Sequence, residues 1–160
     1  MSTLSSPAKS GWGSLNRPFL AIAFRVWLTE IVISGLNFFV LIGLIWDPLF
    51  GELTSHQIGM TTRIAYIFGL SYLFLCSNPS YTKRDLVHAG MLWLSCTLAF
   101  EWLGSTLIQG RSVDDILTGW HVWEGYMWPC VLVAYTSANY IVGTWLVRQG
   151  KTAAGTTSKR

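Results

Sequence analysis

The chain has 160 residues, of which 51% are hydrophobic and only 12% are charged. Because soluble globular proteins carry about 25% charged residues, this composition argues against a soluble protein. The formal net charge is only +3, so the charge does not favour a nucleic-acid partner and we expect none. The length favours a single domain.

Four apolar segments are long enough for membrane-spanning helices, which need about 20 residues. They cover about residues 19–46, 58–76, 86–108 and 126–147. Backbone polar groups in lipid must be paired within a helix or a closed barrel, and barrel strands span only about 10 residues. The sequence therefore predicts an all-α membrane protein, with an antiparallel four-helix transmembrane bundle over residues 19–147.

Two of the predicted helix starts carry capping-box patterns. The segment Thr54–Gln57 precedes the second span, and Thr82–Asp85 precedes the third. In a capping box, a Ser or Thr and the residue three positions later each accept a hydrogen bond from the other's backbone N–H. We therefore expect the second and third helices to begin at these segments.

Basic residues divide unevenly between the two sides of the predicted bundle. One side holds nine of the eleven: Lys9, Arg17, Arg25, Lys83, Arg84, Arg148, Lys151, Lys159 and Arg160. Cytoplasmic loops are enriched in Lys and Arg, so we expect a polar cytoplasmic segment at 1–18, a basic cytoplasmic tail at 148–160, and a multi-pass protein of the inner (plasma) membrane. The Ser-rich start also resembles a transit peptide, so an organelle membrane is the alternative.

The loop before the fourth span has a helical pattern of its own. Ser112 and Asp115 have capping-box spacing. The following apolar residues share one helical face: Val113, Ile116, Leu117, Trp120 and Trp123. The polar face holds Asp114, Asp115, His121 and Glu124. This pattern predicts a short amphipathic helix on the outer leaflet, either as a connector or as a lid over the bundle.

Three ionisable residues lie within the predicted spans, where charges are costly and mark candidate functional sites. Counting about 1.5 Å per residue, Arg63 lies about 9 Å from the outer end of its span. By the same count, Glu101 lies about 10–12 Å from the outer end of the next one. Because a short loop joins these two spans, we predict an ion pair between Arg63 and Glu101. Glu30 lies in the inner third of the first span, apart from that pair.

Two amides complete the polar residues predicted inside the bundle. Asn37 and Asn139 lie in the first and fourth spans, and such side chains commonly bridge helices. One hypothesis is a structural network that holds the helices in register. A second is a relay through Glu30, Arg63 and Glu101 that carries protons or gates a polar ligand, and a third is partner binding.

Metal and haem sites have little support in the sequence. The three histidines, His56, His88 and His121, lie at different depths and cannot flank one macrocycle. His121 and Glu124 have i, i+3 spacing, which is a weak metal pattern without further ligands. The acidic residues of the outer loop are those of a solvated surface. We therefore expect no metal and no cofactor.

A series of short motifs lies between residues 100 and 130: Phe100-Glu101-Trp102, Gly110-Arg111-Ser112, Asp114–Leu117 and Trp128-Pro129. This series resembles a group of small, uncharacterised bacterial four-span integral membrane proteins. The chain departs from that group at Gly119-Trp120-His121, where an acidic-aromatic-amide run is typical. The resemblance implies a four-span fold in a membrane and implies no activity.

No phosphate loop, nucleotide fingerprint, nucleophile elbow or zinc pattern is present in the sequence. We therefore predict a non-enzymatic membrane protein, either an accessory subunit or a small binding or transport component with a buried polar network. The alternative is a proton- or quinone-linked redox component. A third hypothesis is a structural subunit. Beyond the lipid bilayer, the partner would be a larger membrane complex or further copies of the chain.

Overall fold

The computed structural model describes residues 16–108 and 110–150, which form helices joined by short connections, with no strand among them. Within this range, four helices are long and apolar enough to cross a membrane: Arg17–Phe50, Glu52–Ser77, Lys83–Ile108 and Trp128–Arg148. The predicted helical class is confirmed, and so is the number of segments that are long and apolar enough to cross a membrane. Most of the predicted terminal segments, 1–18 and 148–160, lies outside the described residues.

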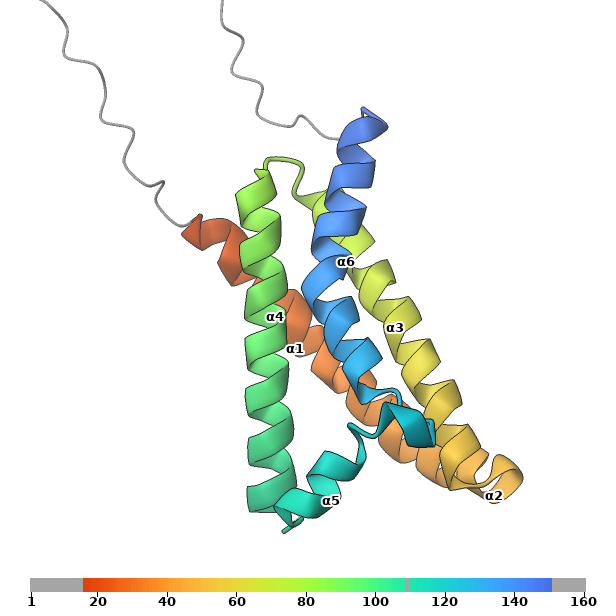
Figure 1. Cartoon of the computed structure of the whole chain (residues 1–160). Coiled ribbons are helices and arrows are strands. Elements are labelled where there is room, and N and C mark those ends of the chain that lie inside the picture. The colour runs from red at the N-terminus through yellow and green to blue at the C-terminus, as the bar shows by residue number, and fades with distance from the viewer. Residues whose placement is uncertain (1–15, 109, 151–160) are drawn as a thin grey trace, which may run out of the picture.

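The first spanning helix is unusually long. It comprises α1 (Arg17–Leu36), the π-helical segment η1 (Asn37–Trp46) and α2 (Asp47–Phe50), 34 residues in all. At 1.5 Å per residue a helix of this size is about 51 Å long, against a hydrocarbon core of about 30 Å. Figure 1 shows it crossing obliquely behind α4 and α6. Inside a bilayer, a helix this long would have to tilt or to extend beyond the hydrocarbon core.

The second spanning helix, α3 (Glu52–Ser77), begins well before the predicted residue 58. Gly51 separates it from α2 at a φ of 78°, a conformation that glycine adopts without steric cost. The helix start predicted at Thr54–Gln57 is therefore wrong, since those residues already lie in its first turns. The Ser55 hydroxyl donates back to the Gly51 carbonyl at 2.8 Å instead of capping.

The third spanning helix is α4 (Lys83–Leu103), which continues as the π-helical segment η2 (Gly104–Ile108). Its predicted capping box is confirmed: Thr82 Oγ1 accepts from the Asp85 N–H, and Asp85 accepts from the Thr82 N–H at 2.9 Å. Two tryptophans tie this helix to α1. Trp93 donates to the Ala23 carbonyl at 2.8 Å, and Trp27 donates to Thr97 at 2.9 Å.

The outer segment is shorter than predicted. The capping box of Ser112 and Asp115 is confirmed and starts α5, but α5 covers only Val113–Thr118. A separate 3₁₀ turn, η3, follows at Val122–Glu124. The continuous amphipathic helix through Trp123 is therefore wrong, because the chain leaves the helix at Gly119 and Trp120. Of its predicted apolar face, Ile116 is buried while Trp123 is 78% exposed.

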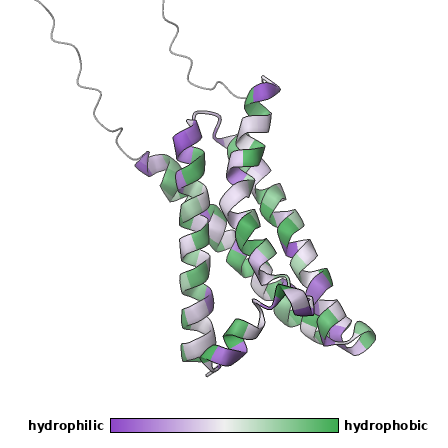
Figure 2. Cartoon of the chain, in the orientation of Figure 1, coloured by the Kyte–Doolittle hydropathy of each residue, from purple (hydrophilic) through white to green (hydrophobic). Residues whose placement is uncertain are grey.

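The last spanning helix, α6 (Trp128–Arg148), packs against both α3 and α4. The start of α1, the α3–α4 connection and the end of α6 lie at one end of the molecule, whereas α2 and α5 lie at the other (Figure 1). Apolar residues run along the lengths of the helices, and hydrophilic residues lie mostly toward their ends (Figure 2). Many large apolar side chains are exposed, among them Val32, Leu44 and Leu107, so the outward faces have a composition that suits contact with lipid.

Candidate functional site

An ion pair joins α1 and α3 in the interior of the molecule. Arg63 donates through Nε to Glu30 Oε1 at 3.2 Å. Glu30 is fully buried and Arg63 is 9% exposed. The predicted pair between Arg63 and Glu101 is wrong: no ion pair or hydrogen bond joins these two described residues, and Arg63 binds the carboxylate that was expected to lie apart.

The oblique course of the first long helix relative to the other helices accounts for this difference. Depth counting placed Glu30 in the inner third of a span that crosses the membrane directly. In the structure Glu30 lies well inside the 34-residue helix Arg17–Phe50. That helix takes an oblique course past the others (Figure 1), and the Glu30 carboxylate reaches Arg63 on α3. A residue count along a tilted helix does not measure depth.

A short hydrogen-bonded chain surrounds the ion pair. The Ser34 hydroxyl donates to Glu30 Oε1 and lies 2.7 Å from the Tyr66 hydroxyl. On the other side, Arg63 Nη2 donates to the Tyr135 hydroxyl at 2.9 Å. Three helices, α1, α3 and α6, thus contribute to one polar cluster, which we call the ion-pair cluster: Glu30, Ser34, Arg63, Tyr66 and Tyr135.

Aromatic rings complete the surroundings of the guanidinium. Arg63 Cζ lies 5.3 Å from the centroid of the Trp128 ring and 5.6 Å from that of Tyr135. Such contacts stabilise a cation where water is scarce. The sequence pattern did not identify Ser34, Tyr66, Tyr135 and Trp128 as members of this site. Helical spacing carries part of the signal, since Ser34 follows Glu30 by four residues and Tyr66 follows Arg63 by three.

The two predicted amides behave differently. Asn37 is buried and donates through Nδ2 to the Gly59 carbonyl at 3.1 Å, so it bridges η1 and α3 as predicted. Asn139 is fully buried in α6, and neither atom of its amide has a hydrogen-bond partner among the described residues. The structure therefore shows no bridge from Asn139.

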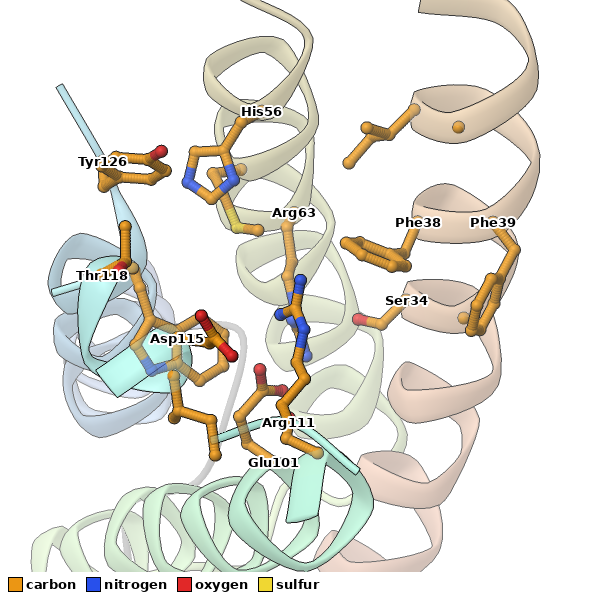
Figure 3. A pocket seen from close by; sticks show the side chains of 18 of the residues that line it. Ser34, Phe38, Phe39, His56, Arg63, Glu101, Arg111, Asp115, Thr118 and Tyr126 are labelled. Carbon is orange, nitrogen blue, oxygen red and sulfur yellow. The ribbon is translucent and has the colours of Figure 1, made fainter. Parts of the chain in front are cut away.

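A cavity of about 540 Å³ lies beside the ion-pair cluster. Its walls come from α1, η1, α3 and α4, and α5 runs across the end of the molecule where it lies (Figure 1). Arg63 lines it and Glu30 does not. The charged lining residues are Asp47, Glu52, Arg63, Glu101, Arg111 and Asp115. Figure 3 shows Arg63 and Glu101 extending into this space from opposite walls.

Apolar and aromatic side chains form the rest of the lining, among them Phe38, Phe39 and Phe100. The lining therefore combines charged and apolar side chains. Such a combination suits a molecule that is itself part polar and part apolar.

The predicted outer residues lie at or beyond one end of this cavity. Asp115 lines it, whereas Asp114, His121 and Glu124 do not. The hydroxyl of Ser112 donates to the Asp115 carboxylate at 2.7 Å and its N–H does so at 3.2 Å. These two hydrogen bonds lower the pKa of Asp115 below its ordinary value. His121 Nδ1 lies 3.3 Å from Glu124 Oε2, which is an exposed local contact.

Within the described residues, no group of three or more His, Cys, Asp or Glu side chains is arranged to hold a metal ion. The charged side chains of the cavity can instead bind ionised groups directly. Comparisons of the chain with protein-family models, curated proteins and solved structures give no match. The function therefore has to be argued from the geometry of this site.

Proposed function

We propose that the chain is an integral membrane protein whose four helices cross the inner membrane in antiparallel order, with both termini cytoplasmic. We further propose that it binds a small amphiphilic molecule in the cavity, as a binding or transport component without a chemical reaction. Four apolar helices of spanning length support the first part. The basic residues at the end that holds the start of α1 and the end of α6 support the orientation.

The observation that carries the binding role is the cavity itself. Its volume of about 540 Å³ falls within the 300–1,000 Å³ typical of small-molecule sites. Charged groups within membrane-spanning segments are costly, and where they occur they commonly mark a site for an ion or a ligand. A purely structural network would need the Glu30–Arg63 pair but would not need Glu101 and Arg111 beside an open volume.

Gly35 provides a way to close the cavity without disturbing the helices. It lines the cavity, and a Cβ built on it meets no atom within 4 Å. Gly69 is equally open but lies on α3 away from the cavity. Gly35→Phe therefore fills the cavity, and Gly69→Phe is a matched control, because both changes replace a helical glycine by the same side chain.

The test is native mass spectrometry of protein purified in mild detergent. We expect the wild-type chain and the Gly69→Phe variant to carry a non-covalently bound amphiphile, and the Gly35→Phe variant to lack it. A wild-type chain that carries nothing, or a Gly35→Phe variant that keeps the same molecule, would contradict the proposed function.

A further inference from the structure

Arg63 has hydrogen-bonding capacity that the protein does not use. A guanidinium has five N–H donors. Of these, Nε binds Glu30 and one Nη2 donor binds Tyr135. No described residue accepts from Nη1, and the Arg63 side chain, which is 11% exposed, lines the cavity. Nη1 is not among the buried polar atoms that lack a partner, so it is accessible from the cavity. An occupant with an anionic oxygen can therefore form a charge-assisted hydrogen bond with it. Phosphate oxygens match the planar geometry of a guanidinium.

A carboxylate on α4 lines the same cavity. Glu101 extends into the cavity (Figure 3), and no hydrogen bond or ion pair joins its carboxylate to a described residue. Its carboxylate interacts electrostatically with Arg63 and Arg111. An occupant with only an anionic group would leave the Glu101 carboxylate without a donor. A primary ammonium offers three donors, so it satisfies this carboxylate where a quaternary ammonium cannot.

The remaining wall opens toward the outer surface of the helices. Phe38, Phe39 and Phe100 line the cavity and are nevertheless 42%, 65% and 49% exposed. They lie where the first and third spanning helices diverge, since α1 packs against α4 but η1 packs against α3 (Figure 1). In the proposed orientation this surface faces hydrocarbon. A ligand can therefore keep its apolar chains in the bilayer while its polar group enters the cavity.

From these three walls we infer that the ligand is a phospholipid with a primary ammonium headgroup, as in phosphatidylethanolamine. Its phosphate binds the free Nη1 edge of Arg63 together with Arg111, its ammonium binds Glu101, and its chains lie along Phe38, Phe39 and Phe100. This inference rests on the proposed function and adds the chemical class of the ligand.

The test compares three phospholipids with identical acyl chains and ethanolamine, choline or glycerol headgroups. Each is titrated into delipidated protein, and the bound fraction is measured by native mass spectrometry. We expect ethanolamine lipid to bind about ten-fold more tightly than the other two, because one charge-assisted hydrogen bond contributes about that factor. Water-soluble phosphoethanolamine, which lacks the chains, is expected to bind far more weakly than the lipid.

Two variants locate the selectivity. Glu101→Gln is expected to bind all three lipids with similar affinity, because the acceptor for the ammonium has lost its charge. Asp114→Asn is the matched control, since this carboxylate lies outside the cavity lining, and it should keep the ten-fold preference. Gly35→Phe should bind none of the three.

The outcomes separate this inference from the proposed function. Equal binding of the three lipids by the wild-type chain, or an unchanged preference in Glu101→Gln, overturns the headgroup assignment. The proposed function still stands in that case if Gly35→Phe abolishes lipid binding. Equal binding of phosphoethanolamine and the lipid overturns the assignment of a membrane source. Absence of binding by every compound overturns both proposals.

Discussion

Removing either partner of the Glu30–Arg63 ion pair is expected to lower the free energy of unfolding by about 3–5 kcal/mol, because the remaining charge stays buried without its partner. Glu30 is fully buried and Arg63 nearly so. In the Glu30→Met and Arg63→Met double variant no charge is left unpaired, so the loss should be smaller than the sum of the two single losses. Unfolding by sodium dodecyl sulfate in mixed micelles measures all three variants.

Glu101→Met is the control for this double-variant cycle. Glu101 is half-buried and lacks an ion-pair partner among the described residues, so its replacement should change the stability by less than either change in the pair. The structure's pairing is refuted if the stability losses of Glu30→Met and Arg63→Met add strictly while those of Arg63→Met and Glu101→Met are strongly coupled. That result would favour the Arg63–Glu101 pair predicted from depth counting.

Introducing a single methyl group at Gly90 is expected to destabilise the protein by about 1–3 kcal/mol, the usual cost of overpacking. A Cβ on Gly90 would lie 2.3 Å from the carbonyl oxygen of Thr136 and 3.2 Å from its carbon. Both atoms belong to the backbone of α6, so the clash is relieved only if α4 and α6 move apart. Small residues at helix contacts allow such close approach in membrane proteins.

Gly69→Ala is the matched change for this prediction. A Cβ at Gly69 meets nothing within 4 Å, and alanine favours a helix over glycine by about 1 kcal/mol. The two substitutions should therefore have opposite signs in the same unfolding assay. Equal stabilisation by Gly90→Ala and Gly69→Ala would show that α4 and α6 do not approach as closely as the structure has them.

The number and type of the spanning helices could be predicted because both depend on local sequence. A run of apolar residues identifies a helix of spanning length whatever its neighbours are. The capping boxes at Thr82 and Ser112 were predicted for the same reason. The one at Thr54 was not formed, because Gly51 starts the helix earlier and the same residue pattern then lies inside it.

The ion-pair partner of Arg63 could not be predicted from residue counts. It depends on the tilt of a 34-residue helix, and tilt is set by packing against neighbouring helices and not by length. Glu30 and Arg63 were correctly predicted to be buried. Their partners Ser34, Tyr66 and Tyr135 were missed because hydroxyl-bearing residues are common in such helices and carry no distinctive pattern.

The cavity had no counterpart in the analysis of the sequence. It exists because η1 follows α3 while α4 takes another course, with α5 running across the end between them (Figure 1). The sequence predicted a helix that could cover the end of the bundle. Only the folded structure shows that this helix is short and that its Asp115 lines the cavity.

A cavity with charged walls lies among the four candidate membrane-spanning helices, toward the end that holds α2 and α5. Thiol labelling tests it most directly, in a background with Cys76, Cys96 and Cys130 replaced by alanine. We expect a membrane-impermeant thiol reagent, added on the side of α2 and α5, to modify the Gly35→Cys variant and to leave the Gly69→Cys variant unmodified. A Gly35→Cys variant that resists this reagent from both sides, while a lipid-soluble reagent modifies both variants, would contradict the account.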